Sequence, residues 1–245
     1  MKFYKYEGTG NDFLILETSV APSKVDIQRL CDRRFGVGAD GILFASASTH
    51  AAIMMNYYNA DGSVASMCGN GLRCFVQYLL DQQQLQTSDF TVETLAGMID
   101  VHVEGSLIEM NLGPAIIHPS QRIEGVAVVP VRLATEHAVV FASTKHERLE
   151  QGPLITHHSN FPSGVNTSFV EVREDRLFVE THERGAGWTL SCGTGVAASA
   201  AVAVQKGLVA SPVTVMVPGG ELTVRVEEDV YLKGPATYIA KGEWL

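Results

Sequence analysis

The sequence lacks the long apolar runs of a membrane protein. Although 46% of its 245 residues are hydrophobic, no apolar segment approaches the roughly 18 residues that a membrane-spanning helix needs. The first residues, Met1 to Tyr6, lack the apolar core of a secretory signal peptide. We therefore expect a soluble, cytoplasmic protein that has a sizeable buried core and no membrane partner.

The sequence also has few basic residues, and they form no cluster. It contains 18 Lys and Arg against 27 Asp and Glu, which gives a net charge of −9 at pH 7. A nucleic-acid-binding protein needs a basic patch to neutralise phosphates, so we expect no nucleic-acid partner. An anionic small molecule is not excluded, because a single well-placed arginine can bind a carboxylate.

Cysteine is scarce as well. The chain has 4 cysteines, at positions 31, 68, 74 and 192, and no C-x-x-C pair. This pattern does not favour a zinc site, a thioredoxin-like motif or a disulfide framework, and we expect no bound metal. Cys31 and Cys74 are interpreted as small buried hydrophobic side chains.

What the chain does contain is an internal repeat. Cys68-Gly69-Asn70-Gly71 and Cys192-Gly193-Thr194-Gly195 each precede an apolar stretch, and two further pairs of motifs recur in the same order. Each pair is separated by about 120 residues, which is typical of a duplicated domain. We expect an N-terminal domain of residues 1–113, to which the tail 236–245 returns, and a C-terminal domain of residues 114–235. The further pairs are Thr91-Val92 with Thr214-Val215, and Gly113-Pro114-Ala115 with Gly234-Pro235-Ala236.

Hydrophobic periodicity predicts three helices. They cover Val25–Arg34, the stretch from Gly71 to about Asp81, and Val196–Val204. Alternating apolar and polar residues predict strands over much of both halves, with turns at segments rich in Gly and Asn. The sequence therefore predicts an α/β protein in which the two halves follow the same order.

A cysteine directly before Gly-x-Gly at the start of a helix has two physical consequences. The glycines let backbone N–H groups approach a ligand closely, and the helix N-terminus favours both a bound carboxylate and a thiolate. Because Cys68 and Cys192 occupy equivalent places in the repeat, we expect them to face one cleft from opposite sides. A thiolate on one face and a thiol on the other can together invert a stereocentre by general acid–base catalysis.

The sequence predicts no cofactor for this chemistry. The segment from Gly193 to Ala198 matches the loose dinucleotide-binding pattern G-x-G-x-x-A, but no apolar strand directly precedes it. Thr214-Val215-Met216 also stands where a ribose-binding acid is required. We interpret the match as a coincidence.

Two longer motifs surround the paired cysteines. One runs from Asn59-Ala60-Asp61-Gly62-Ser63 to Cys68-Gly69-Asn70-Gly71-Leu72-Arg73-Cys74, and the other from Glu183-Arg184-Gly185-Ala186-Gly187 to Cys192-Gly193-Thr194-Gly195. These motifs resemble the diaminopimelate epimerase family, and the resemblance covers nearly the whole chain. It implies two pseudo-symmetric α/β (α+β) domains, each a curled, mostly antiparallel sheet around a central helix. It also implies a cofactor-independent enzyme with an amino-acid substrate between the domains, usually a homodimer.

The resemblance implies a role for each matched residue. Cys68 and Cys192 are the implied base and acid. Side chains that bind the substrate's amino and carboxylate groups are expected to be amides or charged groups, although Asn59 alone would also fit a simple turn and Glu183-Arg184 a surface ion pair. The residues implied to bind substrate are Gly69, Asn70, Gly193 and Thr194 through their N–H groups, and Asn11, Asn59, Asn166, Glu183 and Arg184 through their side chains.

The chain departs from the family in one segment. Ser143-Thr144-Lys145-His146 stands where the family has Gly-Asn-Pro-His, so Thr144 replaces an asparagine that contacts the substrate and Lys145 adds a cation. We expect His146 to position the loop rather than react. Thr156 likewise stands where the family usually has Glu, just before the matching His158, and Trp188 falls at a variable position.

The function predicted first is the interconversion of LL- and meso-diaminopimelate, which serves the synthesis of lysine and cell-wall precursors. A racemase of the same family that acts on another amino acid, such as histidine or lysine, stays open because of Thr144-Lys145. A non-catalytic amino-acid-binding protein is the remaining alternative, and it would need neither thiol.

Both paired cysteines are expected to be indispensable for inversion. Cys68→Ala and Cys192→Ala should each lower turnover by about 10²–10⁴-fold, which is the usual contribution of a general acid or base, and should leave the circular dichroism spectrum unchanged. Cys31→Ala serves as the control and should behave like wild type. A single Cys68 or Cys192 variant that epimerises at nearly the wild-type rate in both directions would refute the two-base mechanism.

Overall fold

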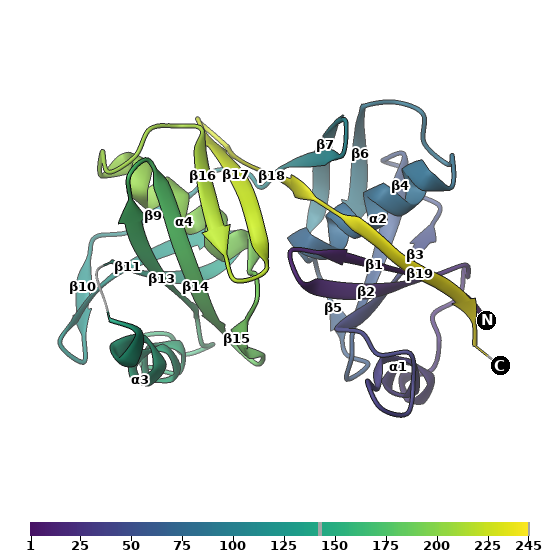
Figure 1. Ribbon diagram of the computed structural model, residues 1–245, viewed down its shortest axis with the longest axis horizontal. Coiled ribbons are helices and arrows are strands. Elements are labelled where there is room, and N and C mark those ends of the chain that lie inside the picture. The colour runs from purple at the N-terminus through teal and green to yellow at the C-terminus, as the bar shows by residue number, and fades with distance from the viewer. Residues whose placement is uncertain (142–143, 245) are drawn as a thin grey trace. The chain divides into compact units, whose positions relative to one another are not determined.

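The structure, a computed structural model, describes residues 1–141 and 144–244, and it divides into two compact units. Unit 1 comprises Met1–Met110 and Gly234–Leu245, and unit 2 comprises Asn111–Lys233. In Figure 1 the N-terminal part of unit 1 is coloured purple to blue, and most of unit 2 is teal to green. The C-terminal strand is yellow. The domain bounds expected from the sequence, at 113/114 and 235/236, lie close to these divisions.

Unit 1 is a mostly antiparallel sheet. Its neighbouring strands pair antiparallel except at two places, where β2 pairs with β3 and β4 pairs with β6 in parallel. Each parallel step is bridged by a helix, as such crossovers usually are. The elements are β1 (Lys2–Gly8), β2 (Asn11–Leu16), α1 (Lys24–Cys31), β3 (Gly41–Ser46), β4 (Ile53–Asn59), β5 (Val64–Ala65), α2 (Gly69–Asp81), β6 (Asp89–Thr94), β7 (Gly97–Glu104), β8 (Leu107–Asn111) and β19 (Thr237–Glu243).

Helix α2 forms the centre of unit 1. Its apolar side chains Leu72, Phe75, Val76 and Leu79 are all buried, and the helix contacts β1, β2, β3, β4 and β19. Figure 1 shows these strands passing around it. A helix that is apolar on several sides has to be covered on several sides, and the sheet therefore curls around α2.

Unit 2 repeats this arrangement. Its strands also pair antiparallel except at two helix-bridged steps, β12 with β13 and β14 with β16. The elements are β9 (Ile116–Ile117), β10 (Gln121–Ile123), β11 (Val126–Leu133), β12 (Thr135–Phe141), α3 (Lys145–Thr156), β13 (Asn166–Arg173), β14 (Arg176–Glu183), β15 (Gly187–Thr189), α4 (Gly193–Gln205), β16 (Val213–Val217), β17 (Gly220–Val226) and β18 (Val230–Pro235).

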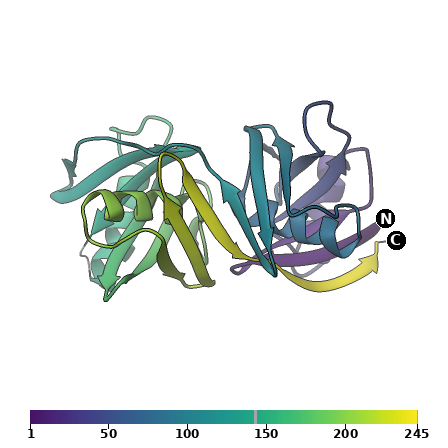
Figure 2. The same ribbon diagram turned by 90° about the horizontal axis from the view of Figure 1, so that it is seen from above.

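Helix α4 is the counterpart of α2. It is rich in alanine and is buried almost continuously from Val196 to Ala203. It contacts β11, β12, β13, β14, β16 and β17, and Figure 2 shows strands of unit 2 on more than one side of it. Alanine and valine side chains are small enough for strands to approach closely from several directions. The fold class expected from the sequence, two similar α/β halves with a curled sheet around a central helix, is confirmed.

The sequence analysis identified α1, α2 and α4 but missed α3. Helix α1 begins at Lys24, one residue before the predicted start, and the Ser23 side chain caps it by accepting a hydrogen bond from the Asp26 N–H. In α3, Leu149 and Leu154 are exposed and Pro153 lies inside the helix, so no apolar stripe marks it. Its position between β12 and β13 matches that of α1 between β2 and β3, and only this correspondence identifies it.

One buried ionisable group in unit 2 has a consequence for stability. His137 lies on β12, is fully buried, and has no hydrogen-bond partner for either ring nitrogen among the described residues. Burial lowers the pKa of His137 from 6.5 to about 3, because a charged imidazolium is poorly solvated inside the core. The unfolded chain therefore binds this proton more tightly than the folded protein does.

We expect His137 to make the fold acid-sensitive. Its contribution to stability is complete above pH 6.5 and is lost as the pH falls from there toward 3, so unfolding should become easier by about 2 kcal/mol between pH 6.5 and 5. Denaturant titrations at both pH values should show a smaller loss for His137→Leu than for wild type. His118→Leu removes an exposed histidine and should keep the wild-type loss. Equal losses in wild type and His137→Leu would contradict this assignment.

Candidate active site

Cys68 stands at the N-terminus of α2, where three residues of unit 1 meet. It is the N-cap of the helix, and its sulfur accepts a hydrogen bond from the Gly71 N–H at 3.5 Å. The Cys68 Sγ lies 3.7 Å from Asn11 Oδ1, and the Asn70 side-chain amide donates to the same oxygen at 3.4 Å. The structure thus brings together Asn11, Cys68 and Asn70, three of the residues that the sequence singled out.

Asn11 is itself held in place by a carboxylate. Its amide donates to Asp40, and Asp40 also pairs with Arg33, which bridges to Asp12. Burial alone would raise the pKa of Asp12, but the hydrogen bonds from Arg33 and Lys5 outweigh it and lower that pKa. The sequence analysis did not predict that Asp40 orients Asn11.

Asn59 occupies a turn at the end of β4. The Tyr57 hydroxyl donates to Asn59 Oδ1 at 2.7 Å, and the Asn59 amide donates to Ser63 Oγ at 3.0 Å. These contacts hold the side chain within the turn that connects β4 to β5. The described contacts do not join Asn59 to the cluster around Cys68.

Cys192 stands at the equivalent position in unit 2, the N-terminus of α4. It is only 5% exposed, and its sulfur lies 3.8 Å from the Thr194 hydroxyl. Burial raises the pKa of Cys192 well above its ordinary value, and the nearby Glu183 carboxylate raises it further, whereas the Gly195 N–H and the Thr194 hydroxyl oppose the shift. Cys192 is therefore held in its neutral thiol form.

Glu183, Arg184 and Asn166 lie together at one end of two paired strands. Thr167 on β13 stands opposite His182 on β14, so Asn166 and Glu183 are the next residues along. The Arg184 N–H donates to Asn166 Oδ1 at 2.9 Å, and its guanidinium donates to the Ser163 carbonyl at 2.7 Å. The Glu183 carboxylate accepts from the Thr189 hydroxyl at 2.6 Å. Asn166 thus fixes the backbone from which Arg184 projects.

Gly71 and Gly195, the third residue after each cysteine, leave little room for a side chain. A Cβ on Gly195 would lie 2.8 Å from Ser168 Oγ and 3.3 Å from Cys192 Sγ. A Cβ on Gly71 would lie 3.3 Å from the Phe13 ring. Glycine therefore lets each helix N-terminus, with its partial positive charge, sit directly against the sheet and beside a thiol.

The segment that departs from the family has a structural explanation at Thr144. Thr144 is the N-cap of α3 and forms a capping box with Glu147, so its hydroxyl serves the helix. His146 is largely exposed and lies near Glu150. Ser143, the first residue of that segment, lies outside the described residues.

Thr156 and His158 also have structural roles. The Thr156 hydroxyl is buried and lies 2.9 Å from both Thr167 Oγ1 and His182 Nδ1. His158 accepts a hydrogen bond from the Asn160 N–H and lies 3.8 Å from Glu124. The sequence analysis did not predict a role for His182, which directly precedes the motif that begins at Glu183.

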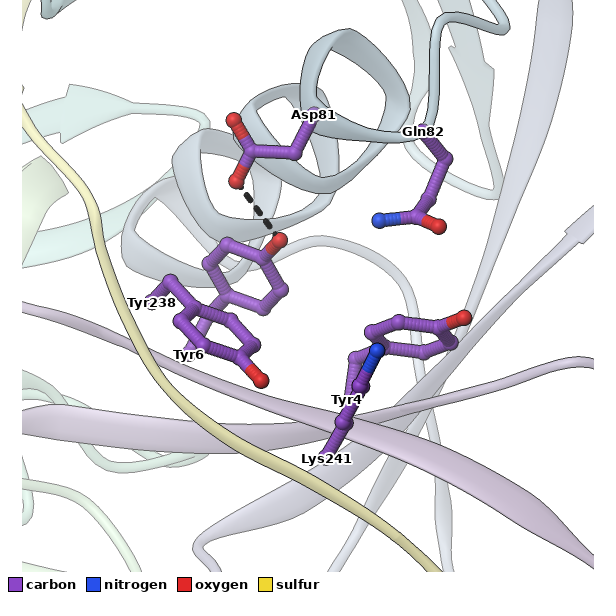
Figure 3. A pocket seen from close by; sticks show the side chains of 6 residues that line it. All are labelled: Tyr4, Tyr6, Asp81, Gln82, Tyr238 and Lys241. Carbon is purple, nitrogen blue, oxygen red and sulfur yellow. Dashed lines mark hydrogen bonds between the residues drawn. The ribbon is translucent and has the colours of Figure 1, made fainter.

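The cavities of the two units differ in their relation to the site. A cavity of about 250 Å³ in unit 2 is lined by Lys145, Trp188 and Thr189, among others, and Thr189 also binds Glu183. A cavity of about 260 Å³ in unit 1 is lined by Tyr4, Tyr6, Asp81, Gln82, Tyr238 and Lys241. Figure 3 shows the Tyr6 hydroxyl of this second cavity pointing at the Asp81 carboxylate.

The unit 1 cavity is not part of the candidate site. Asp81 is the last residue of the 13-residue helix α2, and Cys68 precedes its first residue. At 1.5 Å per residue the two ends are about 20 Å apart. Within the described residues, no group of three His, Cys, Asp or Glu side chains is arranged to hold a metal ion, and no helix has the length and apolarity to cross a membrane.

Comparison with known proteins identifies relatives over the full length of the chain. The family model described as diaminopimelate epimerase matches residues 3–118 and 130–239. A diaminopimelate epimerase of Caldanaerobacter subterraneus subsp. tengcongensis is 38% identical over 272 residues, which cover 99% of both chains. One from Alkaliphilus metalliredigens is 35% identical over 276 residues, which cover 100% of this chain and 98% of the relative.

Solved structures of more distant proteins share the fold. A Bacillus anthracis phenazine biosynthesis protein of the PhzF family has a TM-score of 0.80 at 15% identity, covering 100% of this chain and 99% of that one. A hydroxyproline epimerase from Agrobacterium vitis has a TM-score of 0.76 at 14% identity, covering 99% of this chain and 90% of that one. At this level of identity the similarity establishes the fold alone.

We expect Glu183→Gln to lower the pKa of Cys192. Removing the negative charge beside the sulfur stabilises the thiolate, although burial continues to raise the pKa. The pH midpoint of Cys192 alkylation by iodoacetamide, followed by peptide mass spectrometry, should fall by about one unit. Glu180→Gln, on the same strand but bound to Arg148, is the control and should not shift it. An unchanged or higher midpoint in Glu183→Gln would show that the carboxylate does not act on the thiol.

Proposed function

This chain belongs to the diaminopimelate epimerase family of isomerases, and we propose that it interconverts LL- and meso-diaminopimelate by inverting one α-carbon. The observation that carries this proposal is the equivalent position of Cys68 and Cys192. Each occupies the N-cap position of the central helix in one of two units with the same topology. A binding protein would need neither thiol.

In the proposed reaction the two sulfurs act on the same α-carbon from opposite faces. One sulfur, as thiolate, takes the α-proton, and the other, as thiol, delivers its proton to the opposite face. One C–H bond and one S–H bond are broken, and one of each is formed. The thiolate and the thiol have therefore exchanged roles after each turnover. In the reverse direction each sulfur performs the other step.

The main cost of the reaction is the charge left on the α-carbon and its carboxylate. We propose that the N-termini of α2 and α4 bind this carboxylate through the N–H groups of Gly69 and Asn70 and of Gly193 and Thr194. The glycines beside the sulfurs support this role, since a Cβ on Gly195 would collide with Ser168. Donors fixed before the reaction stabilise charge more effectively than water that has to reorganise.

The proposed reaction uses only side chains and helix N-termini, so we propose an enzyme that works without pyridoxal phosphate or another cofactor. We further propose that the protein is a cytoplasmic homodimer that acts in lysine biosynthesis. The homodimer and the cytoplasmic location rest on the family resemblance.

The distal end of the substrate is the second part of the proposal. Diaminopimelate carries an amino-acid group at both ends, and we propose that Arg184 binds the carboxylate that does not react. Asn166 supports this role, because it holds the Arg184 backbone at 2.9 Å. Asn11, Asn59 and Glu183 are proposed to bind the amino and carboxylate groups.

A racemase acting on a different amino acid is the second candidate function. It is favoured by Thr144 and Lys145, because Thr144 is occupied as a helix cap and cannot replace an asparagine amide. Lys145 also lines the cavity that holds Trp188. A substrate whose far end is apolar or anionic would suit that cavity.

The two candidates predict different substrate profiles. If Arg184 binds a distal carboxylate, kcat/KM should be higher for diaminopimelate than for histidine, lysine and alanine, and Arg184→Ala should lower it by at least about tenfold for diaminopimelate. The loss for any monocarboxylic amino acid should be smaller. Arg176→Ala, which removes an exposed arginine from the opposite end of β14, the strand that Arg184 follows, is the matched control. Turnover of a monocarboxylic amino acid and none of diaminopimelate would select the racemase.

A further inference from the structure

Arg73 is a charged side chain buried in the core of unit 1. It lies in α2, in the turn that follows Cys68, and its side chain is 0% exposed. Its Nε donates to the Pro235 carbonyl at 3.0 Å, and its Nη2 donates to Thr9 Oγ1 at 3.1 Å. Both partners are neutral, so they satisfy hydrogen bonds without compensating the positive charge.

No carboxylate forms an ion pair with Arg73 within the described parts of the chain. The Nη1 atom is buried and has no hydrogen-bond partner among these residues. An arginine does not lose its proton under ordinary conditions, and a buried cation without a counter-anion is strongly destabilising. Such a cation stabilises the ionised form of any acid that lies close to it.

The acids whose charge acts on Arg73 are Cys74, Cys68 and Glu7. Cys74 is fully buried, and burial raises its pKa well above the ordinary value, so it stays neutral. Cys68 is only partly buried, and it also accepts a hydrogen bond from the Gly71 N–H. Of the two thiols near the cation, Cys68 is the one that is not fully buried.

One loop connects the arginine to the sulfur. Thr9 accepts from Arg73, and two residues later Asn11 contacts Cys68. Gly8, which begins the loop, packs so closely that a Cβ would lie 3.2 Å from Arg73 Nη2. The same turn therefore holds both the cation and the candidate acid/base group.

The other charged groups around α2 make contacts of their own, and Glu7 is the one carboxylate among the described residues whose charge acts on Arg73 without an ion pair to it. On β1, Glu7 accepts a hydrogen bond from the Gly10 N–H, and Lys5 pairs with Asp12 of β2, which also binds Arg33. Strand β3 carries no ionisable side chain. On β4, the Tyr57 hydroxyl donates to Asn59, and on β19, Tyr238 and Lys241 line the cavity at the opposite end of α2.

Unit 2 has no equivalent of Arg73. The matching position in the repeat is Ala197, which is buried in α4. The hydroxyls of Ser168 and Thr181 lie beneath the start of α4, against Gly195. The charged group that acts on Cys192 is the carboxylate of Glu183. The two thiols thus have the same backbone setting and opposite electrostatic surroundings.

We propose that Arg73 is the buried counter-cation of Cys68, and that it makes Cys68 the thiolate and Cys192 the thiol of the resting protein. Arg73 is a positioning residue, since it acts on the sulfur and not on the substrate. The inference rests on the proposed function only for the use of the two thiols. It means that one direction of epimerisation starts from the resting state, with Cys68 taking the α-proton and Cys192 giving one. The other direction requires the proton to move from Cys192 to Cys68 first.

The test is the pH dependence of thiol alkylation in the substrate-free protein. Iodoacetamide labelling of each cysteine is followed by peptide mass spectrometry, in wild type, Arg73→Met and Arg73→Lys. Arg73→Met keeps much of the side-chain length and removes the charge, so the Cys68 midpoint should rise by about one pH unit. Arg73→Lys keeps the charge and should restore most of the wild-type midpoint. The Cys192 profile should be the same in all three proteins.

Arg148→Met is the matched control, because it removes a mostly buried arginine from unit 2 and should leave the Cys68 midpoint unchanged. A Cys68 midpoint that stays unchanged in a folded Arg73→Met protein would overturn the proposal, and so would equal shifts in Arg73→Met and Arg73→Lys. If Arg73→Met does not fold, the alkylation midpoints of the wild-type protein test the proposal instead. A lower midpoint for Cys192 than for Cys68 would overturn it. Alkylation needs no substrate, so these outcomes are independent of whether the protein epimerises diaminopimelate.

Discussion

The placement of two helix N-termini against their sheets is the constraint on which the rest of the structure depends. Each helix begins with a cysteine followed by Gly-x-Gly, and a Cβ on Gly71 or Gly195 would press against Phe13 or Ser168. The apolar bodies of α2 and α4 require strands on several sides, and the curled sheets provide them. Packing therefore fixes the helix axis, and the helix axis fixes where the thiol and the N–H groups lie.

The two units share a backbone topology, but the polar and charged groups around their cysteines differ. Around Cys68 the described polar groups are the Gly71 N–H and the Asn11 side chain, to which the Asn70 amide donates, and the same helix carries the buried Arg73. Around Cys192 they are the Thr194 hydroxyl and the Glu183 carboxylate. A two-base inversion needs one ionised and one protonated sulfur at a time, and a duplicated fold with symmetric surroundings would not distinguish them. Divergence of a few side chains is sufficient to do so.

The segment before α3 shows that the structural role of a substituted residue depends on the fold around it. Compared with the family motif, Thr144 replaces an asparagine and lacks its side-chain amide, and Lys145 replaces a proline. In the fold, Thr144 completes a capping box with Glu147, a feature that usually stabilises a helix by about 1 kcal/mol. Lys145 then becomes the first residue of α3 and lines a cavity with Trp188 and Thr189. Thr189 in turn donates a hydrogen bond to Glu183, so the change at Lys145 lies close to the candidate site of unit 2.

The sequence alone determined the repeat, the two cysteine-capped helices and the fold class, because helix periodicity, turn residues and duplicated motifs are local signals. It did not show α3, whose apolar residues are partly exposed and which contains Pro153. It placed Arg73 inside a motif without indicating its burial, and it assigned no role to His137 or His182. Burial, a missing counter-ion and hydroxyl contacts such as that of Thr156 with His182 join residues that are distant in the chain. Only the tertiary structure decides them, since they depend on which strands cover each helix.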